Sequence, residues 1–375
     1  MKIDINIVSK NECELIEEMY AVNDSGMQMS KIGFTTLGSR YCGHYVNTVT
    51  VGGVVTLPQY RREGLVRQML NKMFDMAPER GWAVSFLHPF SFSYYRKFGY
   101  EKVADHKVVE FPIEKLEFIP RCTDLVPVES KETAVDCVKV YNKFASKRNI
   151  MFRRYGTSIY PTEPDQGAEK KTYIWYDKNG EPASYIMLGQ EQYFSVNRMI
   201  SVNLNIYEMA FTTKESLMAL FGFIRMFEGE DNKVKIHNCA MAPEIDIILK
   251  HYMHTSYTII PDIQARVLDV KKMLSLNLYP AERGMFTIKV EDILPYTRGV
   301  YRVEYQNGQA DVKKLTDDAG YDLSAAMPSF TQLLYGYDEY DVYTAAFMDG
   351  VKIVNPNSDF FKVFHKKNNG VFEHF

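Results

Sequence analysis

The sequence predicts a mixed α/β (α+β) protein built from three consecutive blocks. Its 375 residues correspond to two or three domains of about 150 residues. Segments with alternating apolar residues are interspersed with segments whose apolar residues recur every three or four positions, as strands and helices require. A hydrophobic share of 46% and a charged share of 24% are ordinary for a chain with a sizeable core.

The charge and the composition argue against several classes of protein. The net charge of −3 disfavours nucleic-acid binding, which needs a basic surface. No run of apolar residues approaches the length of a membrane span, and the N-terminus lacks the apolar segment of a signal peptide. Five scattered cysteines and one close histidine pair, His251 and His254, give neither a disulfide framework nor a metal site. We therefore expect a cytoplasmic protein with no metal, no membrane partner and no nucleic-acid partner.

The first block, residues 1–125, begins with strands and ends with two helices. Ser9 and Glu12 form a capping-box pattern, which predicts a helix over the apolar residues of 15–20. The other predicted elements are a strand at 3–7, a hairpin of 33–37 and 41–46 around Gly38-Ser39, strands at 48–57 and 83–87, a helix burying Leu65, Val66, Met69, Leu70, Met73 and Phe74, and a short helix within 89–99.

The second block, residues 126–265, repeats the order of a strand followed by a helix. Its predicted strand at 199–211 leads into a helix capped by Thr212 and Glu215, but that junction carries no arginine and no glycine. We therefore expect the fold without phosphate binding there. The other predicted elements are a helix around 135–144 and a hairpin of 172–176 and 183–188 turning at Asn179-Gly180.

The third block, residues 266–375, has strands at 286–290 and 300–305 with a turn at Asn307-Gly308. A helix is predicted to start at 330–334, and Asp349-Gly350 marks another turn.

The segment from Val51 to Arg67 is the most informative part of the chain. A valine-rich strand leads to a turn containing Arg61, Arg62 and Gly64, and a helix starts immediately afterwards. The first backbone N–H groups of a helix lack partners inside the helix, and glycine allows an anion to approach the backbone closely. This pattern predicts a pyrophosphate site, although a basic helix start is often only a solvated surface.

The turn resembles the acetyl-coenzyme A loop of the GNAT N-acetyltransferases, with Arg61, Arg62, Glu63 and Gly64 matching. Val66-Arg67 and the later segment Tyr95-Arg-Lys-Phe-Gly-Tyr100 are similar to motifs of the Eis (enhanced intracellular survival) family within that superfamily. The resemblance implies a GNAT catalytic domain, a second GNAT-like domain without a cofactor loop and a sterol-carrier-protein-like C-terminal domain, and it extends to a hexameric assembly. By the same resemblance the residues that bind acetyl-coenzyme A are Val54, Val55, Thr56, Arg62, Glu63, Gly64, Leu65, Val66, Arg67, Phe90 and Ser91.

Two residues are assigned catalytic roles by this resemblance. Tyr95 matches the general acid, and a tyrosine with a pKa of about 10 can protonate a leaving thiolate. Phe375 matches a terminal phenylalanine whose carboxylate reaches the active site. A carboxylate with a pKa of about 3.5 is a weak base for an ammonium group, so its role needs desolvation, a relaying water or simple positioning of the amine.

The expected reaction is direct acetyl transfer to a primary amine of a small cationic acceptor, such as an aminoglycoside, a polyamine or a lysine-like compound. The chain departs from the family pattern at two places that affect which acceptor could bind. The segment between Met19 and Gly33 is too short for the usual second helix and second strand, and His374 stands where an acidic residue would help to bind a cation. The alternative is a non-catalytic sensor or scaffold that binds acyl-coenzyme A.

Overall fold

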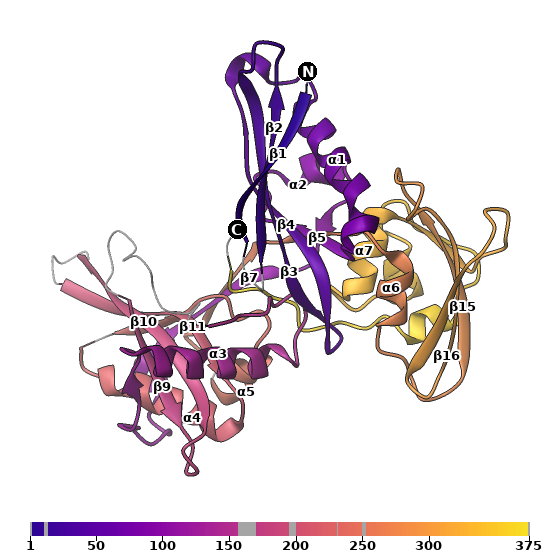
Figure 1. The fold of residues 1–375 in the computed structure, drawn as a ribbon. Coiled ribbons are helices and arrows are strands. Elements are labelled where there is room, and N and C mark those ends of the chain that lie inside the picture. The colour runs from indigo at the N-terminus through magenta and orange to yellow at the C-terminus, as the bar shows by residue number, and fades with distance from the viewer. Residues whose placement is uncertain are drawn as a thin grey trace. The chain divides into compact units, whose positions relative to one another are not determined.

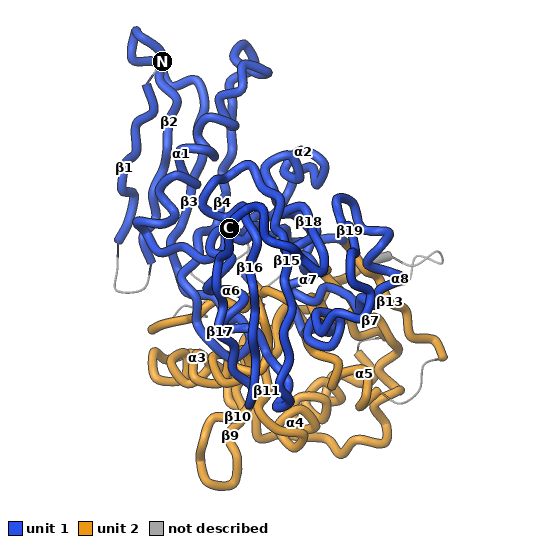
Figure 2. The backbone as a smooth tube through the Cα atoms, turned by 90° about the vertical axis from the view of Figure 1, so that its right-hand side faces the viewer, with its two compact units in different colours: residues 1–104, 261–369, 373–375 blue, residues 105–260, 370–372 orange. Residues whose placement is uncertain are grey.

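Three β-sheets organise the computed structural model, which describes residues 2–10, 14–156, 170–194, 200–230, 232–249 and 253–373. The chain divides into two compact units, drawn in blue and orange in Figure 2. The first unit comprises residues 1–104, 261–369 and 373–375, and the second comprises residues 105–260 and 370–372. The division into 1–125, 126–265 and 266–375 stays a prediction, and residues 105–125 of its first block lie in the second unit. Within the described residues, no helix has the length and apolar character needed to cross a membrane.

The first sheet has the order β1-β2-β3-β4-β5-β14-β6 and lies in the first unit. Strands β1 to β4 are antiparallel neighbours, whereas β4 and β5 run parallel and are joined through helix α1. The strands are β1 (Lys2–Lys10), β2 (Leu15–Val22), β3 (Gln28–Tyr41), β4 (His44–Thr56), β5 (Val84–Leu87), β6 (Glu101–Lys102) and β14 (Gln264–Val267), and the helices are η1 (Pro58–Tyr60), α1 (Leu65–Arg80) and α2 (Phe92–Arg96).

Helix α1 packs on one face of this sheet, as the predicted apolar spacing requires (Figure 1). Leu65, Met69, Leu70, Met73 and Phe74 are buried, and Val66 is half-buried at the edge. The helix ends at Gly81, which takes the left-handed conformation at φ +66°. The prediction for this helix is therefore confirmed.

The predicted helix at 15–20 is wrong, because these residues form strand β2. Met19 and Ala21 are fully buried, whereas Glu18 and Tyr20 between them are only partly buried, which is the two-residue period of a strand. Strands β1 and β3 pair with β2 on both sides, and this pairing overrides the weak local helix signal. Ser9 of the predicted capping box lies in β1, and Glu12 lies outside the described residues.

The turn of the next hairpin lies at Cys42-Gly43 and not at Gly38-Ser39. Both turn residues have positive φ, +47° at Cys42 and +84° at Gly43, as in the two-residue turns that match strand twist. Gly38 and Ser39 continue β3 and pair with Asn47 and Val46.

The third sheet, with the order β17-β16-β15-β18-β19, also belongs to the first unit. Arg266 on β14 of the first sheet is fully buried and donates two hydrogen bonds, of 2.9 and 2.8 Å, to Asp292 just after β15. This buried ion pair connects the first and third sheets. The elements are α6 (Val270–Ser275), β15 (Gly284–Glu291), β16 (Gly299–Gln306), β17 (Gln309–Lys314), β18 (Leu323–Ala326), α7 (Met327–Tyr335), α8 (Val342–Ala345), β19 (Lys352–Ile353) and η4 (Asp359–Lys362).

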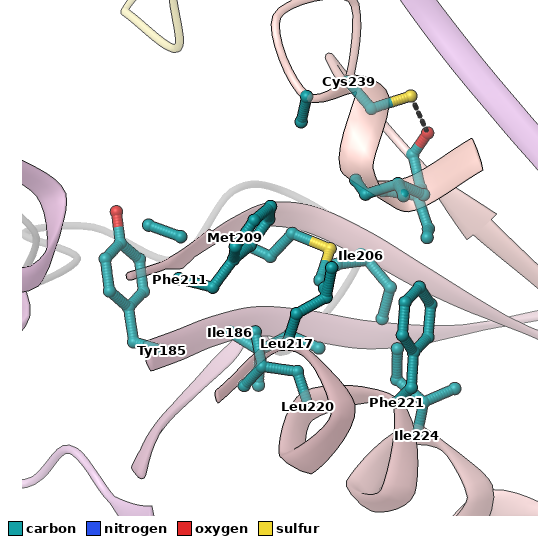
Figure 3. Packing of buried hydrophobic residues seen from close by; sticks show 14 of the residues in the cluster. Tyr185, Ile186, Ile206, Met209, Phe211, Leu217, Leu220, Phe221, Ile224 and Cys239 are labelled. Carbon is teal, nitrogen blue, oxygen red and sulfur yellow. Dashed lines mark hydrogen bonds between the residues drawn. The ribbon is translucent and has the colours of Figure 1, made fainter. Parts of the chain in front are cut away.

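The second unit contains the sheet β13-β7-β12-β11-β10-β9-β8. Helix α4 packs Leu217, Leu220 and Phe221 against the residues of β10 and β11 (Figure 3). Its N-cap is Thr213, paired with Ser216, one residue later than the predicted Thr212 and Glu215. The elements are β7 (Asp105–Pro112), η2 (Ile113–Leu116), β8 (Val126–Pro127), α3 (Lys131–Ala145), β9 (Lys171–Tyr176), β10 (Pro182–Phe194), β11 (Ile200–Phe211), α4 (Lys214–Ile224), η3 (Arg225–Phe227), β12 (Lys233–Ile236), α5 (Pro243–Leu249) and β13 (Ser256–Pro261).

Candidate active site

The candidate active site lies where strands β4 and β5 stop pairing. The two strands pair in parallel from Thr48 and Val84 as far as Val51 and Leu87. Strand β4 then continues to Thr56, whereas β5 has ended. Ligands of open α/β sheets bind beyond the carboxyl ends of parallel strands, so this gap is the expected place for one.

An irregularity in β4 marks the same place. Between the pairs Lys31–Val55 and Gly33–Gly52, strand β4 contains one more residue than β3, and Gly53 has φ +57°. The N–H of Leu57 donates to Met29 on β3 at 3.0 Å. Because successive N–H groups of a strand point to opposite sides, that of Thr56 points away from β3, toward the edge that β5 no longer covers.

The basic turn after β4 presents several exposed cations. Arg61, Arg62 and Arg67 are exposed and have no acidic partner within the described part of the chain. Gly64 is the N-cap of α1 with φ +76°, and a Cβ atom added to it would meet nothing within 4 Å. The space beside Gly64 is therefore open, and the first N–H groups of α1 lack partners inside the helix, which together suit the binding of a phosphate group.

The other predicted cofactor residues differ in what they can offer. Leu65 is buried in the core of the first unit, so only its backbone N–H is available, whereas Glu63 is exposed. Phe90 is an apolar side chain that is 75% exposed. Ser91 caps helix α2 by accepting a hydrogen bond from the N–H of Tyr94. Thus Ser91 also has a structural role that the sequence analysis did not anticipate.

Tyr95 lies on α2 and is almost completely buried in the first unit. Its ring contacts those of Phe90, Tyr94 and Tyr100, with centroids 5.5, 5.1 and 6.1 Å away. Burial raises the pKa of Tyr95 to about 12, and the neighbouring Tyr94 adds to this effect. The Tyr95 hydroxyl has no hydrogen-bond partner among the described residues, so it is free to donate to a bound molecule.

The structure connects Tyr95 to the basic turn through its neighbour. The positive charge of Arg67, in the first turn of α1, acts on the pKa of Tyr94 and partly offsets the increase that burial causes. The side chain of Tyr94 on α2 is therefore close enough to the start of α1 to feel the charge of Arg67.

The structure explains why position 99, within the segment Tyr95–Tyr100, is a glycine. Gly99 has φ +86°, and a Cβ atom there would lie 1.6 Å from Nη1 of Arg266. That same nitrogen donates a hydrogen bond to the carbonyl oxygen of Phe98. Gly99 therefore makes room for the buried arginine that holds the loop after α2 in place.

His88 is a site residue that the sequence analysis missed. It directly follows β5, where Nδ1 lies 2.8 Å from a carboxylate oxygen of Asp262 and Nε2 lies 3.2 Å from the carbonyl oxygen of Glu373. Its position after a buried strand was a usable signal, but Asp262 is distant in the sequence and gave none. Phe375, whose terminal carboxylate is predicted to reach the active site, lies outside the described residues.

A groove of about 320 Å³ lies along the other face of β3 and β4. Val55 is 56% exposed and Leu57 36% exposed there. Lys31 donates to Glu18 at 2.7 Å, and this hydrogen bond together with one from Tyr20 lowers the pKa of Glu18. The groove is lined by Tyr20, Gln28, Met29, Ser30, Lys31, Val55 and Leu57.

No metal site was predicted, and the described residues contain no group of three or more His, Cys, Asp or Glu side chains that could hold a metal ion.

Comparison with known proteins identifies the part of the chain that contains this site. Residues 7–103 match the family described as acetyltransferase (GNAT) domain. No curated protein sequence matches the chain.

Solved structures match nearly the whole chain. A GCN5-related N-acetyltransferase from Anabaena variabilis has a TM-score of 0.81 at 17% identity, over 96% of this chain and 89% of its own. A protein of Enterococcus faecalis described as a probable N-acyltransferase has a TM-score of 0.77 at 19% identity, with the same shares covered. Eis1 from Mycobacterium abscessus has a TM-score of 0.74 at 13% identity, over 100% of both chains. At these identities the likeness establishes the fold. The GNAT domain at 7–103 makes the chain an enzyme of the acetyltransferase type.

Proposed function

We propose that this chain transfers an acetyl group from acetyl-coenzyme A directly to a primary amine of a small cationic acceptor, such as an aminoglycoside, a polyamine or a lysine-like compound. The observation that carries the proposal is Tyr95, a buried tyrosine with a raised pKa, whose ring contacts Tyr94, and Tyr94 in turn lies close enough to Arg67 at the start of α1 to feel its charge. GNAT domains generally use acetyl-coenzyme A, and the site fits such a molecule. Arg61, Arg62 and Arg67 are exposed cations without an acidic partner among the described residues, and Phe90 offers an exposed apolar side chain.

Each part of the site has a role in this reaction. Acetyl-coenzyme A, when bound, supplies the activated acetyl group. Arg62, Arg67 and the first N–H groups of α1 hold its phosphates. The N–H groups of Val54 and Thr56 stabilise the negative charge that develops on the carbonyl oxygen, by roughly 3 kcal/mol for each donor. Tyr95 holds the proton that the leaving thiolate needs.

The acceptor amine must lose a proton before or during its attack. The C-terminal carboxylate of Phe375 is the proposed group that positions the amine or receives this proton. The carbonyl oxygen of Glu373, two residues before Phe375, lies 3.2 Å from Nε2 of His88 at the end of β5. By the Eis resemblance we also expect a hexamer and a sterol-carrier-protein-like fold for residues 266–375.

The proposal is tested by incubating the protein with acetyl-coenzyme A and a panel of polyamines, lysine derivatives and aminoglycosides while free thiol is followed. We expect thiol release that depends on at least one amine, with the acetylated amine identified by mass spectrometry. Measurable binding of coenzyme A without thiol release for any amine would favour the alternative, a non-catalytic acyl-coenzyme A sensor or scaffold.

A further inference from the structure

A second pocket lies entirely within the second unit, at the end of strand β11. Its volume is about 460 Å³, within the range of small-molecule sites. The end of α3, the end of β11, the start of α4 and helix α5 all contribute to it. Its lining includes lysines at the rim and apolar side chains along one wall.

One wall of this pocket is apolar. Phe144, Phe211 and Leu217 belong to the core of the second unit, and Figure 3 shows Phe211 and Leu217 among the packed side chains. Ile247 on α5 is 69% exposed at the pocket. Apolar walls that open to solvent favour a ligand with an apolar body, because the ligand would cover this surface.

The rim of the pocket is cationic. Lys143, Lys147 and Lys214 are exposed, and none has an acidic partner within the described residues. Their charges are therefore available to a ligand.

Among the described residues, Glu244 is the only carboxylate that lines the pocket, and Arg148 neutralises its charge. Both oxygens of Glu244 accept hydrogen bonds from Nη2 of Arg148 at 3.0 Å. The Arg148 side chain is 3% exposed, and its Nε and Nη1 donate to the carbonyl oxygens of Met241 and Phe144. This ion pair therefore forms a fixed polar floor, and the lysines leave the pocket with an excess of positive charge.

The pocket occupies the same topological position as the candidate active site of the first unit. Strand β11 pairs in parallel with β12 from Asn203 to Ile206 and then continues to Phe211 beyond the end of β12, while still paired with β10, as β4 continues beyond β5. Helix α4 follows it, as α1 follows β4. The second site has no Gly-Arg turn, and its cations are lysines from α3 and α4. Lysine ammonium groups recognise a compact anion as point charges, without the forked geometry of arginine.

We propose that this pocket binds a small amphipathic anion, with a carboxylate or phosphate head at Lys143, Lys147 and Lys214 and an apolar body against Phe211, Leu217 and Ile247. This proposal concerns the second unit and does not depend on the acetyl transfer proposed for the first.

The test is calorimetric titration of the full chain with octanoate, octyl phosphate and octyltrimethylammonium, each below its micelle concentration. We expect micromolar to submillimolar binding of at least one octyl anion, weakened by added salt, and no binding of the cation. Whichever of octanoate and octyl phosphate binds more tightly identifies the head group that the pocket prefers. Saturating coenzyme A should not displace the ligand, which separates this pocket from the basic turn of the first unit. Absence of binding by both anions, or equal binding of the cation, would overturn the proposal.

Substitutions in the pocket lining test whether the anion binds there. The triple variant Lys143→Gln, Lys147→Gln, Lys214→Gln should weaken binding at least tenfold, and Ile247→Glu should do the same by placing a negative charge at the apolar wall. All four side chains are exposed, so the fold should tolerate these changes. Lys178→Gln is the matched control, because Lys178 is an exposed lysine of the same unit, in the β9–β10 turn, and does not line the pocket. Unchanged affinity in both the triple variant and Ile247→Glu would place the bound anion elsewhere and refute the proposal.

Discussion

Tyr95 combines burial with a hydroxyl that has no partner among the described residues. Its raised pKa means that it keeps its proton far into the alkaline range. A tyrosine with the ordinary pKa of about 10 would be half ionised at pH 10. Tyr95 should therefore remain a competent acid at pH 10 to 11, where an acceptor amine with a pKa of about 10 becomes neutral.

The first prediction concerns the pH dependence and the Tyr95 hydroxyl. The kcat for acetyl transfer should not fall between pH 8 and 10, because ionisation of Tyr95 sets in only near its pKa of about 12. Tyr95→Phe should lower kcat about 100-fold, the usual contribution of general acid catalysis. Tyr94→Phe is the matched control and should change kcat by no more than a few fold. A full loss of rate centred near pH 10, or a Tyr95→Phe enzyme with normal kcat, would remove the tyrosine from the mechanism.

A second prediction at the residue scale concerns the terminal carboxylate. Two residues added after Phe375 should reduce kcat about 100-fold, because the carboxylate is displaced from the site. The same two residues added before Met1 provide the control. Normal acetylation by the extended protein would show that the carboxylate takes no part.

At the scale of elements, the turn between β4 and α1 depends on backbone conformation as well as on charge. Gly64 has φ +76°, which a β-branched residue adopts only at a cost of roughly 1–2 kcal/mol. Gly64→Val should therefore distort the helix start and also place methyl groups where the backbone meets the phosphates. We expect the KM for acetyl-coenzyme A to rise at least tenfold.

Gly180→Val provides the comparison for this change. Gly180 has φ +79° and open space around it, in the β9–β10 turn of the second unit. The two substitutions impose similar strain, so both should lower the thermal midpoint slightly. Only Gly64→Val should change the KM, and equal KM values in the two variants would argue against the basic turn as the cofactor site.

The same scale shows what the sequence could predict. Helix α1 and the hairpin of β9 and β10 were predicted because their local signals, an apolar stripe and an Asn-Gly turn, agree with the tertiary structure. The sequence of β2 predicts a helix because Leu15, Ile16, Met19 and Tyr20 fit the helical period and do not alternate with polar residues, and pairing with β1 and β3 decides the outcome. The basic turn and Tyr95 belong to short local motifs. Asp262 beside His88 belongs to none, so only the fold could reveal it.

At the scale of the whole molecule, a buried ion pair connects the first and third sheets. Arg266 is fully buried and Asp292 is 3% exposed, so removal of either leaves a buried charge without its counterion. Arg266→Met should lower the free energy of unfolding by about 3–5 kcal/mol. The double variant Arg266→Met, Asp292→Leu should recover part of this loss, because no charge remains buried.

Urea unfolding of the purified variants measures these free energies. Lys313→Met is the control, because its ion pair with Asp311 has both side chains 65% exposed and should contribute less than about 1 kcal/mol. A loss below 1 kcal/mol for Arg266→Met would mean that the pair does not hold the first and third sheets together.

The order of the strands in the first sheet also has a consequence for biosynthesis. Strand β14 lies between β5 and β6, although about 160 residues separate it from β6 along the chain. A ribosome that adds roughly 5–20 residues per second needs about 8–30 s to make that stretch. Most of the second unit emerges during this interval, whereas β5 waits with one edge unpaired. The nascent chain therefore carries its basic turn and Tyr95 well before the sheet that positions them is complete, and catalytic competence must come late in translation.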